Sequence, residues 1–224
     1  MDRALARSGR VPGGVLLIGA VKTLPVERVR EAVALGLTDL GENRVQEAER
    51  KIAGIGRSGV RWHLIGHLQR NKVGKALECF DRIHGIDSLE LAAALSGRAA
   101  ATGRRVPALI EVNVSGEASK FGVAPDRLEP LLAEALALPG LAIDGLMTVG
   151  AHVEPAELAR AGFARLRELR DRAAAALGVA LPELSMGMSG DFDVAIEEGA
   201  TQVRVGTALF GARPLGPGGD LKCS

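Results

Sequence analysis

Short apolar runs alternate with longer amphipathic segments along most of this 224-residue chain. The apolar runs have the composition of buried strands, and turn residues follow them. We predict strands at Val15–Val21, Asp39–Leu40, Val60–Ile65, Arg82–Ile86, Val106–Val114, Leu141–Met147, Glu183–Met186 and Gln202–Val205. Strands that alternate with helices are typical of βα units on a parallel sheet.

The segments between these strands predict helices. They cover Pro25–Leu35, Arg44–Ile52, a polar stretch ending at Leu77, Ser88–Ala101, Pro125–Leu138, Pro155–Leu177, and a segment that residues 187–191 open and Glu198 ends. Eight strand–helix units at this length predict an α/β fold with a single closed (β/α)₈ barrel over residues 1–224. Residues 1–14 and 214–224 are expected to be peripheral tails. An open doubly wound sheet is the alternative, although it does not require eight units.

Composition excludes several classes of protein. The formal net charge is +1, only 3% of residues are aromatic and tyrosine is absent, so neither nucleic acid nor an anionic membrane is an expected partner. Cys79 and Cys223 lie far apart, which fits a reducing compartment and predicts no disulfide framework or zinc cluster. We find no signal peptide or membrane-spanning stretch, and therefore expect a cytoplasmic protein.

Glycine-rich polar turns follow the last two predicted strands, where barrels of this type commonly bind phosphate. Ser189 lies in the first turn, and Gly206 and Thr207 form the second. Backbone N–H groups at such turns favour an anion. The alternative is structural: the glycines make tight turns, and Ser189 or Asp191 caps a helix. Two such turns side by side favour a phosphate site.

Strand alternation places two cationic residues at the same opening. Arg204 lies on the opposite face from Val203 and Val205, so it points into the barrel if the valines face the helices. There it can hold an aromatic nitrogen or a carboxylate, or form a salt bridge with a loop carboxylate. Lys22 follows the first strand on the face of Leu16, Ile18 and Ala20, and is expected to be partly desolvated beside a cation, which lowers the pKa of an amine.

A lysine, an arginine and a phosphate site around one opening fit pyridoxal phosphate held as a Schiff base. They also fit a sugar-phosphate aldolase whose lysine amine reacts without a cofactor. The residues alone leave both chemistries open.

Ordered motifs nevertheless resemble one family across nearly the whole chain. They are residues 21–23, 41–47, 62–72, 112–120, 145–148, 184–191 and 203–211. This set resembles the pyridoxal phosphate homeostasis proteins, relatives of the alanine racemase barrel.

The resemblance implies that Lys22 forms the Schiff base and that Ser189, Gly206 and Thr207 contact the phosphate. It further implies that Arg204 faces the ring nitrogen and that Asn43, with His63 as a weaker candidate, lies beside the ring. Such proteins are taken to carry the vitamin B6 cofactor, to deliver it to apo-enzymes and to influence amino-acid balance, without robust turnover.

One difference from the family is the short segment before the first strand, which implies a different cover at the bottom of the barrel. Lys72, Lys75 and Lys120 are candidate secondary amines for holding the cofactor, although solvated loop lysines are the simpler interpretation. With no obvious interface domain, we expect a monomer.

An amino-acid racemase on the same barrel is the alternative function. Racemisation needs a second acid or base opposite the lysine, which in alanine racemases is a tyrosine from the partner subunit, and this chain has no tyrosine. Histidines are possible substitutes, namely His63, His67, His84 and His152, although His84 on an apolar strand is more simply a structural residue. Residues 214–224 are also too few for the β-domain that such racemases carry after the barrel.

Overall fold

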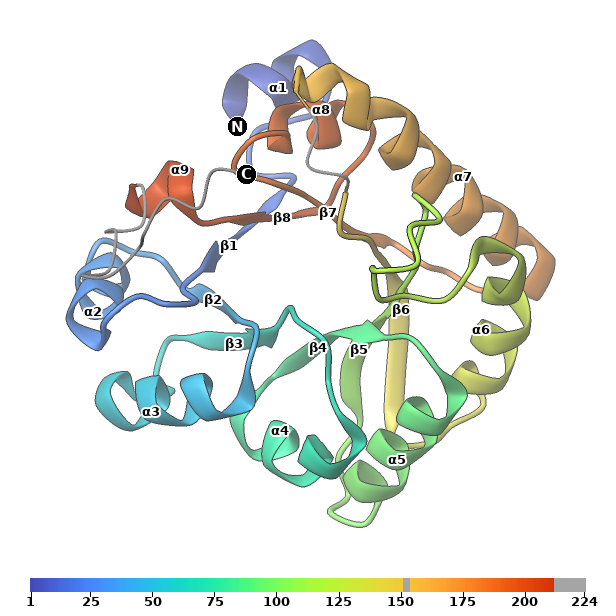
Figure 1. The fold of residues 1–224 in the computed structure, drawn as a ribbon, viewed down its shortest axis with the longest axis horizontal. Helices are drawn as coiled ribbons and strands as arrows, with labels where there is room; N and C mark the ends of the chain where they lie inside the picture. Colours follow the sequence, from blue (N-terminus) through green and yellow to red (C-terminus); the bar gives the residue numbers. More distant parts are fainter. Residues whose placement is uncertain (151–153, 212–224) are drawn as a thin grey trace, which may run out of the picture.

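The computed structural model describes residues 1–150 and 154–211, and within these ranges eight parallel strands close into a barrel (Figure 1). Each strand pairs with the next along the chain, and β8 pairs with β1. The strands are β1 Leu16–Ala20, β2 Asp39–Glu42, β3 Arg61–Leu64, β4 Arg82–Ile86, β5 Val106–Glu111, β6 Leu141–Met147, β7 Glu183–Met188 and β8 Gln202–Val205. The predicted closed barrel is confirmed.

Helices surround the ring of strands in Figure 1. They are α1 Asp2–Arg7, α2 Val26–Ala34, α3 Val45–Ile55, α4 Val73–Cys79, α5 Leu89–Ala100, α6 Leu128–Leu136, α7 Arg160–Leu177, α8 Phe192–Glu197 and α9 Thr207–Phe210. Short 3₁₀ turns precede three of them: η1 Arg70–Lys72, η2 Pro125–Arg127 and η3 Ala156–Ala159. In the described part of the chain, no helix is both long and apolar enough to cross a membrane.

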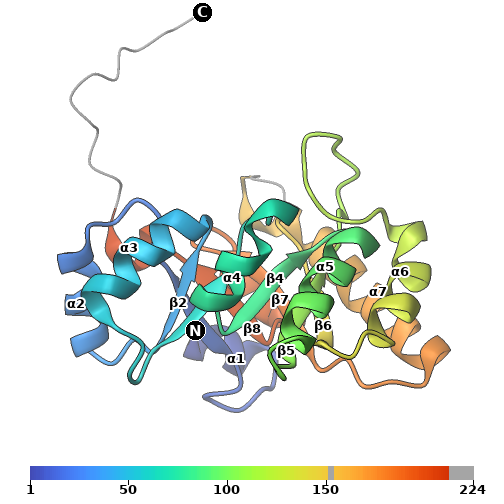
Figure 2. The same ribbon diagram turned by 90° about the horizontal axis from the view of Figure 1, so that it is seen from below.

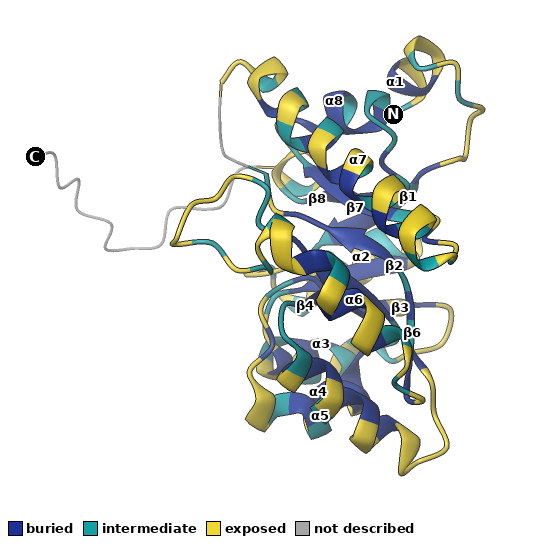
Figure 3. Ribbon diagram, turned by 90° about the vertical axis from the view of Figure 1, so that its right-hand side faces the viewer, coloured by how far each residue is buried: buried dark blue, intermediate teal, exposed yellow. Residues whose placement is uncertain are grey.

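The hydrophobic core lies between the strands and the helices. Outward-facing strand residues such as Leu40, Trp62, Leu184 and Val203 join it, and each is fully buried. Figure 3 shows the same division, with buried strands inside helices whose outer faces are exposed. Because side chains alternate along a strand, the residues between these positions point into the barrel. Many of those inward residues are polar.

Most predicted bounds agree with the structure to within a few residues, but β5 is shorter than expected. We predicted a strand to Val114, whereas β5 ends at Glu111. The Asn113 N–H donates to the Val123 carbonyl (3.0 Å) and the Val123 N–H donates to the Glu111 carbonyl (2.8 Å). The chain therefore leaves the barrel after Glu111 and returns to it at Val123, and residues 113–123 form a loop that projects above the barrel in Figure 2.

Part of the predicted N-terminal tail packs against the barrel, whereas residues 11–14 are exposed. Helix α1 lies against α8, and Leu5 is only 1% exposed. The Arg10 guanidinium donates to the carbonyl of Ile196 (3.2 Å) in the last turn of α8 and to that of Ala200 (2.7 Å) just beyond the helix. The short N-terminal segment thus covers the barrel wall beside α8. Residues 214–224, the other predicted tail, and His152 lie outside the described residues.

Candidate functional site

Lys22 and the loop after β8 line the same cavity. Lys22 follows β1 by two residues, and with Gly206 and Thr207 it borders a cavity of about 350 Å³. Thr23, the next residue, has a left-handed backbone (φ 66°), and this turn directs the chain from the strand into α2. Lys22 itself is exposed, so the expected partial desolvation is wrong for this structure. Ala20, which strand alternation places on the same side as Lys22, lines this cavity with it.

Ser189 connects the loops that follow β7 and β8. Its hydroxyl oxygen accepts hydrogen bonds from the backbone N–H groups of Gly206 (3.0 Å) and Ala208 (3.2 Å). The bend that brings Ser189 there occurs at Gly187, whose φ is 91° and whose added Cβ would lie 2.5 Å from the Ala195 side chain. Ser189 therefore does not cap α8. Its hydrogen bonds bring it next to Gly206 and Thr207, so the three predicted phosphate contacts lie together.

Arg204 is buried inside the barrel, immediately before this loop. It is 4% exposed, and its guanidinium donates to the Ser185 hydroxyl (2.6 Å) and the Thr148 carbonyl (2.8 Å). Val203 and Val205 join the outer core, as the alternation argument requires. Burial lowers the pKa of Arg204 to about 10, which still leaves it charged at neutral pH. Its hydrogen bonds go to neutral oxygens, rather than to the loop carboxylate considered as the alternative.

His63 is buried inside the barrel on β3 and does not border the Lys22 cavity. It is 3% exposed, and both ring nitrogens are engaged: Nε2 with Asp39 Oδ1 (2.9 Å) and Nδ1 with His84 Nε2 (3.0 Å). His84 in turn contacts the Ser185 hydroxyl through Nδ1 (3.0 Å). Burial lowers the pKa of His84 well below its usual range. The interpretation of His84 as a satisfied structural histidine agrees with these contacts.

Asn43 borders a different cavity, of about 490 Å³, between the loops that follow β2 and β3. Lys72 also lines it and is half-buried. The ring of His67 stacks on Phe121 from the 113–123 loop, with centroids 4.0 Å apart. The structure therefore brings Asn43 to the mouth of the barrel but not into the Lys22 cavity.

The other two lysines considered as secondary amines have carboxylate partners. Lys75 is exposed and pairs with Glu78 (3.1 Å) and Glu49 (3.5 Å). Lys120 pairs with Glu117 (2.7 Å) in the 113–123 loop. Neither lysine borders the Lys22 cavity.

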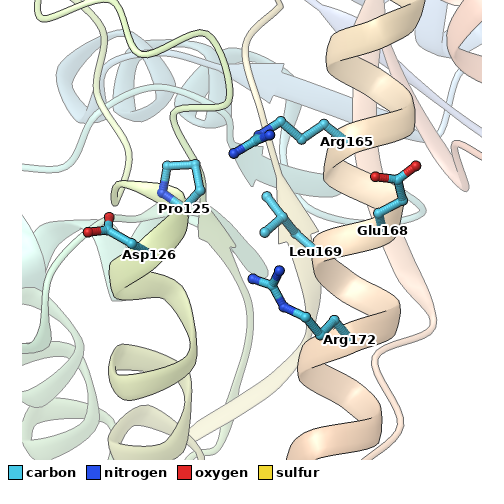
Figure 4. Close-up of a pocket in the computed structure, with 6 residues that line it drawn as sticks. All are labelled: Pro125, Asp126, Arg165, Glu168, Leu169 and Arg172. Carbon is cyan, nitrogen blue, oxygen red and sulfur yellow. The ribbon is translucent and has the colours of Figure 1, made fainter.

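A cavity of about 260 Å³ lies on the outside of the barrel, between η2 and α7 (Figure 4). Arg165 and Arg172 point into it from α7, and Asp126 lies across from them. Its lining carries charges of both signs and none of the predicted site residues, so it is separate from the site at the barrel mouth.

The sequence analysis missed Glu111, the last residue of β5. It is 4% exposed, and its Oε2 has no hydrogen-bond partner among the described residues. A Cβ added to Gly85 would lie 3.2 Å from this oxygen, so Glu111 reaches across to β4 where a glycine leaves space. Burial raises the pKa of Glu111 to about 7, against the opposing effect of Arg204. The only signal in the sequence is one acidic residue in an otherwise apolar run.

Glu111 makes the stability of the cofactor-free protein depend on pH. Because its pKa is higher in the folded state, the folded protein binds the proton more tightly, and stability falls as pH rises from about 4.5 to about 7. Relative to Glu111→Gln, we expect the wild type to lose about 3 kcal/mol of unfolding free energy over this interval, measured by urea denaturation. Glu134→Gln, at an exposed glutamate, should keep the wild-type pH profile. Parallel profiles for wild type and Glu111→Gln would contradict the prediction.

Comparison with known proteins assigns this barrel first to a domain class and then to one protein family. Residues 8–214 match the alanine racemase, N-terminal domain family. The chain is 46% identical over 213 residues to the pyridoxal phosphate homeostasis protein of Aquifex aeolicus, covering 95% of this chain and 93% of that protein. It is also 46% identical to the protein of the same name from Pseudomonas aeruginosa, over 95% and 91% of the two chains. The chain belongs to the pyridoxal phosphate homeostasis protein family.

A solved structure agrees with this assignment. PipY of Synechococcus elongatus, solved with PLP bound, superposes with a TM-score of 0.83 at 38% identity, covering 94% of this chain and 99% of PipY. The fold around the candidate site is therefore that of a relative whose structure contains the cofactor.

Proposed function

We propose that this protein binds pyridoxal 5′-phosphate reversibly, through a Schiff base with Lys22, as an intracellular carrier of vitamin B6. The observation that supports this most directly is the cavity that Lys22 shares with Gly206 and Thr207. An amine and the backbone of a phosphate-type loop border one space, and Arg204 is buried directly before that loop. The name of the relatives and the PLP in PipY support the same ligand.

The residues at this site fit the chemical parts of the cofactor. Thr207 and Ser189 offer hydroxyl groups for a phosphate, and the exposed Lys22 amine can reach an aldehyde. The Gly206 N–H donates to the Ser189 oxygen in this structure and would have to exchange that partner for the phosphate. Bound pyridoxal phosphate supplies an aldehyde that condenses with amines and a ring that accepts electrons. Arg204 would hold the ring nitrogen as a hydrogen-bond donor. The structure gives least support to cofactor contacts from Asn43 and His63. Asn43 borders the neighbouring cavity, and both ring nitrogens of His63 are already bonded to Asp39 and His84.

We infer that carriage rather than turnover is the function. Arg204 remains charged, so it supplies a hydrogen bond to a ring nitrogen without transferring a proton to it, which limits how much negative charge the ring can take up. The missing tyrosine removes the second acid or base of alanine racemases. Transfer to apo-enzymes, a role in amino-acid balance, cytoplasmic localisation and a monomeric state complete the proposal.

The test uses the purified protein titrated with pyridoxal phosphate. We expect a Schiff-base absorption band, and after borohydride reduction a mass label on the peptide that contains Lys22. If no Schiff-base band appeared, the assignment of pyridoxal phosphate as the cofactor would be wrong, and the result would favour the cofactor-free aldolase. Conversion of L- to D-alanine at enzyme-like rates would contradict the non-catalytic role and favour the racemase.

A further inference from the structure

A continuous line of hydrogen-bonded side chains crosses the inside of the barrel. It runs from Arg204 on β8 through Ser185 on β7, His84 on β4 and His63 on β3 to Asp39 on β2. The four links measure 2.6, 3.0, 3.0 and 2.9 Å, and all five residues are at most 4% exposed. Beyond Asp39, Arg61 completes the line with a contact of 2.8 Å and is largely exposed.

The two ends of the line restrict where its protons lie. Arginine can only donate, so Arg204 donates to the Ser185 oxygen. The hydrogen bonds from His63, Arg61 and Thr38 outweigh burial and lower the pKa of Asp39 to about 2, so this carboxylate can only accept. His63 must therefore carry a hydrogen on Nε2, toward Asp39. Only the two middle links remain to be assigned.

Burial lowers the pKa of His84 well below its usual range, so His84 is neutral, and two proton arrangements then satisfy both ends. In the first, Ser185 donates to His84 Nδ1, His84 Nε2–H donates to His63 Nδ1, and both histidines are neutral. In the second, His63 is doubly protonated and His84 carries its hydrogen on Nδ1, toward Ser185. Ser185 then receives two hydrogen bonds, and its own hydrogen finds no other acceptor within the described residues.

Hydrogen-bond satisfaction favours the first arrangement. Ser185 is fully buried, and a buried hydroxyl without an acceptor is destabilising. The second arrangement also adds a buried cation to a barrel that already contains Arg204, while Asp39 is already paired with Arg61. The first arrangement gives the Ser185 hydrogen an acceptor and adds no buried charge.

We propose that Ser185 and His84 are positioning residues for Arg204, and that all protons along this line point from Arg204 toward Asp39. Ser185 anchors one arm of the guanidinium, and the Thr148 carbonyl anchors the second. The histidines keep the Ser185 hydrogen turned away from Arg204, so that its oxygen stays available to the arginine. Because Ser185 and Thr148 hold the two terminal nitrogens of Arg204, the orientation of its guanidinium is set before any ligand binds. The consequence for the ring nitrogen rests on the proposed function.

Nitrogen-15 NMR of the cofactor-free protein tests the line directly. Near neutral pH we expect both histidines to be neutral, with the hydrogen on Nε2 and a bare Nδ1. A hydrogen on His84 Nδ1, or a doubly protonated His63, would overturn the proposed order. The Arg204 guanidinium should give slowly exchanging N–H signals, because it is buried and bonded at two arms.

Variants of Ser185 test its role in positioning. Ser185→Ala should broaden or remove the Arg204 N–H signals, and Ser185→Thr, which keeps the hydroxyl, should restore them. Ser96→Ala is the matched control: Ser96 is also a buried serine, its hydroxyl accepts from the Gly140 N–H (2.9 Å), and it lies on α5, away from the line. Unchanged Arg204 signals in folded Ser185→Ala would overturn the positioning role.

The link to the cofactor has a separate readout. Ser185→Ala should weaken pyridoxal phosphate binding about tenfold and change the pH profile of the absorption band, whereas Ser96→Ala should do neither. If Ser185→Ala matched the wild type in both, the link to the ring would be wrong. If the wild type took up no cofactor, the proposed function would fail, and the NMR measurements would still decide the line on their own.

Discussion

Replacing Lys22 by alanine is expected to abolish covalent retention of pyridoxal phosphate. Lys22 is the lysine that borders the same cavity as Gly206 and Thr207, so no other amine in that cavity can take its place. The phosphate contacts would remain, so weak binding persists, but we expect the dissociation constant to rise by at least about a hundredfold. Equilibrium dialysis, combined with borohydride reduction and mass spectrometry, measures both effects.

Lys75→Ala is the matched control for this experiment. Lys75 is an exposed lysine on α4, paired with Glu49 and Glu78, and its loss should leave cofactor retention at the wild-type level. A label of wild-type intensity in Lys22→Ala, for example on Lys72 or Lys120, would show that the carrier amine had been assigned to the wrong residue.

The second large effect concerns the buried ion pair of Lys51 and Glu42. Their side chains are 7% and 0% exposed, and Lys51 also donates to the Val21 carbonyl (2.6 Å), directly before Lys22. Lys51→Met should lower the unfolding free energy by about 3–5 kcal/mol, because it leaves the Glu42 carboxylate buried without its cation. Urea denaturation measures the loss. Burial already raises the pKa of Glu42, so the variant should also take up a proton on folding.

Two further variants separate the ion pair from general damage. The double variant Glu42→Gln/Lys51→Met should recover part of the lost stability, since it leaves no unpaired charge. Lys75→Met removes an exposed lysine with carboxylate partners and should leave the urea denaturation midpoint at the wild-type value. If Lys51→Met were as mild as Lys75→Met, the buried pair would not stabilise the fold as argued.

Local sequence patterns predicted the strands well where the pattern ended sharply. The bounds of β4, β6 and β8 are as predicted, because charged or turn residues close each apolar run. The overrun of β5 has a tertiary cause. Val112 and Val114 continue the alternation, but the backbone of Asn113 is bonded to Val123, ten residues further along the chain. A local pattern does not contain that contact.

At the candidate site, strand alternation predicted faces correctly but not depth. It placed Arg204 on the inward face of β8, where it lies, and placed Lys22 on the side of Ala20, with which Lys22 shares a cavity. It could not distinguish the exposed Lys22 from the buried Arg204, or show that His63 lies too deep to border the Lys22 cavity. Depth depends on the stagger between strands, which the closed barrel sets and no single strand reveals.

The hydrogen-bonded line through the barrel has a consequence for how this sequence can diverge. In a barrel filled with aliphatic side chains, a larger residue at one position can compensate for a smaller one beside it with little loss of stability. Here a change at Ser185 deprives both Arg204 and His84 of a partner, and a change at His63 does the same to Asp39 and His84. Among descendants of this protein, substitutions at these positions should therefore occur in pairs. Each pair should keep one donor and one acceptor at the link between the two strands.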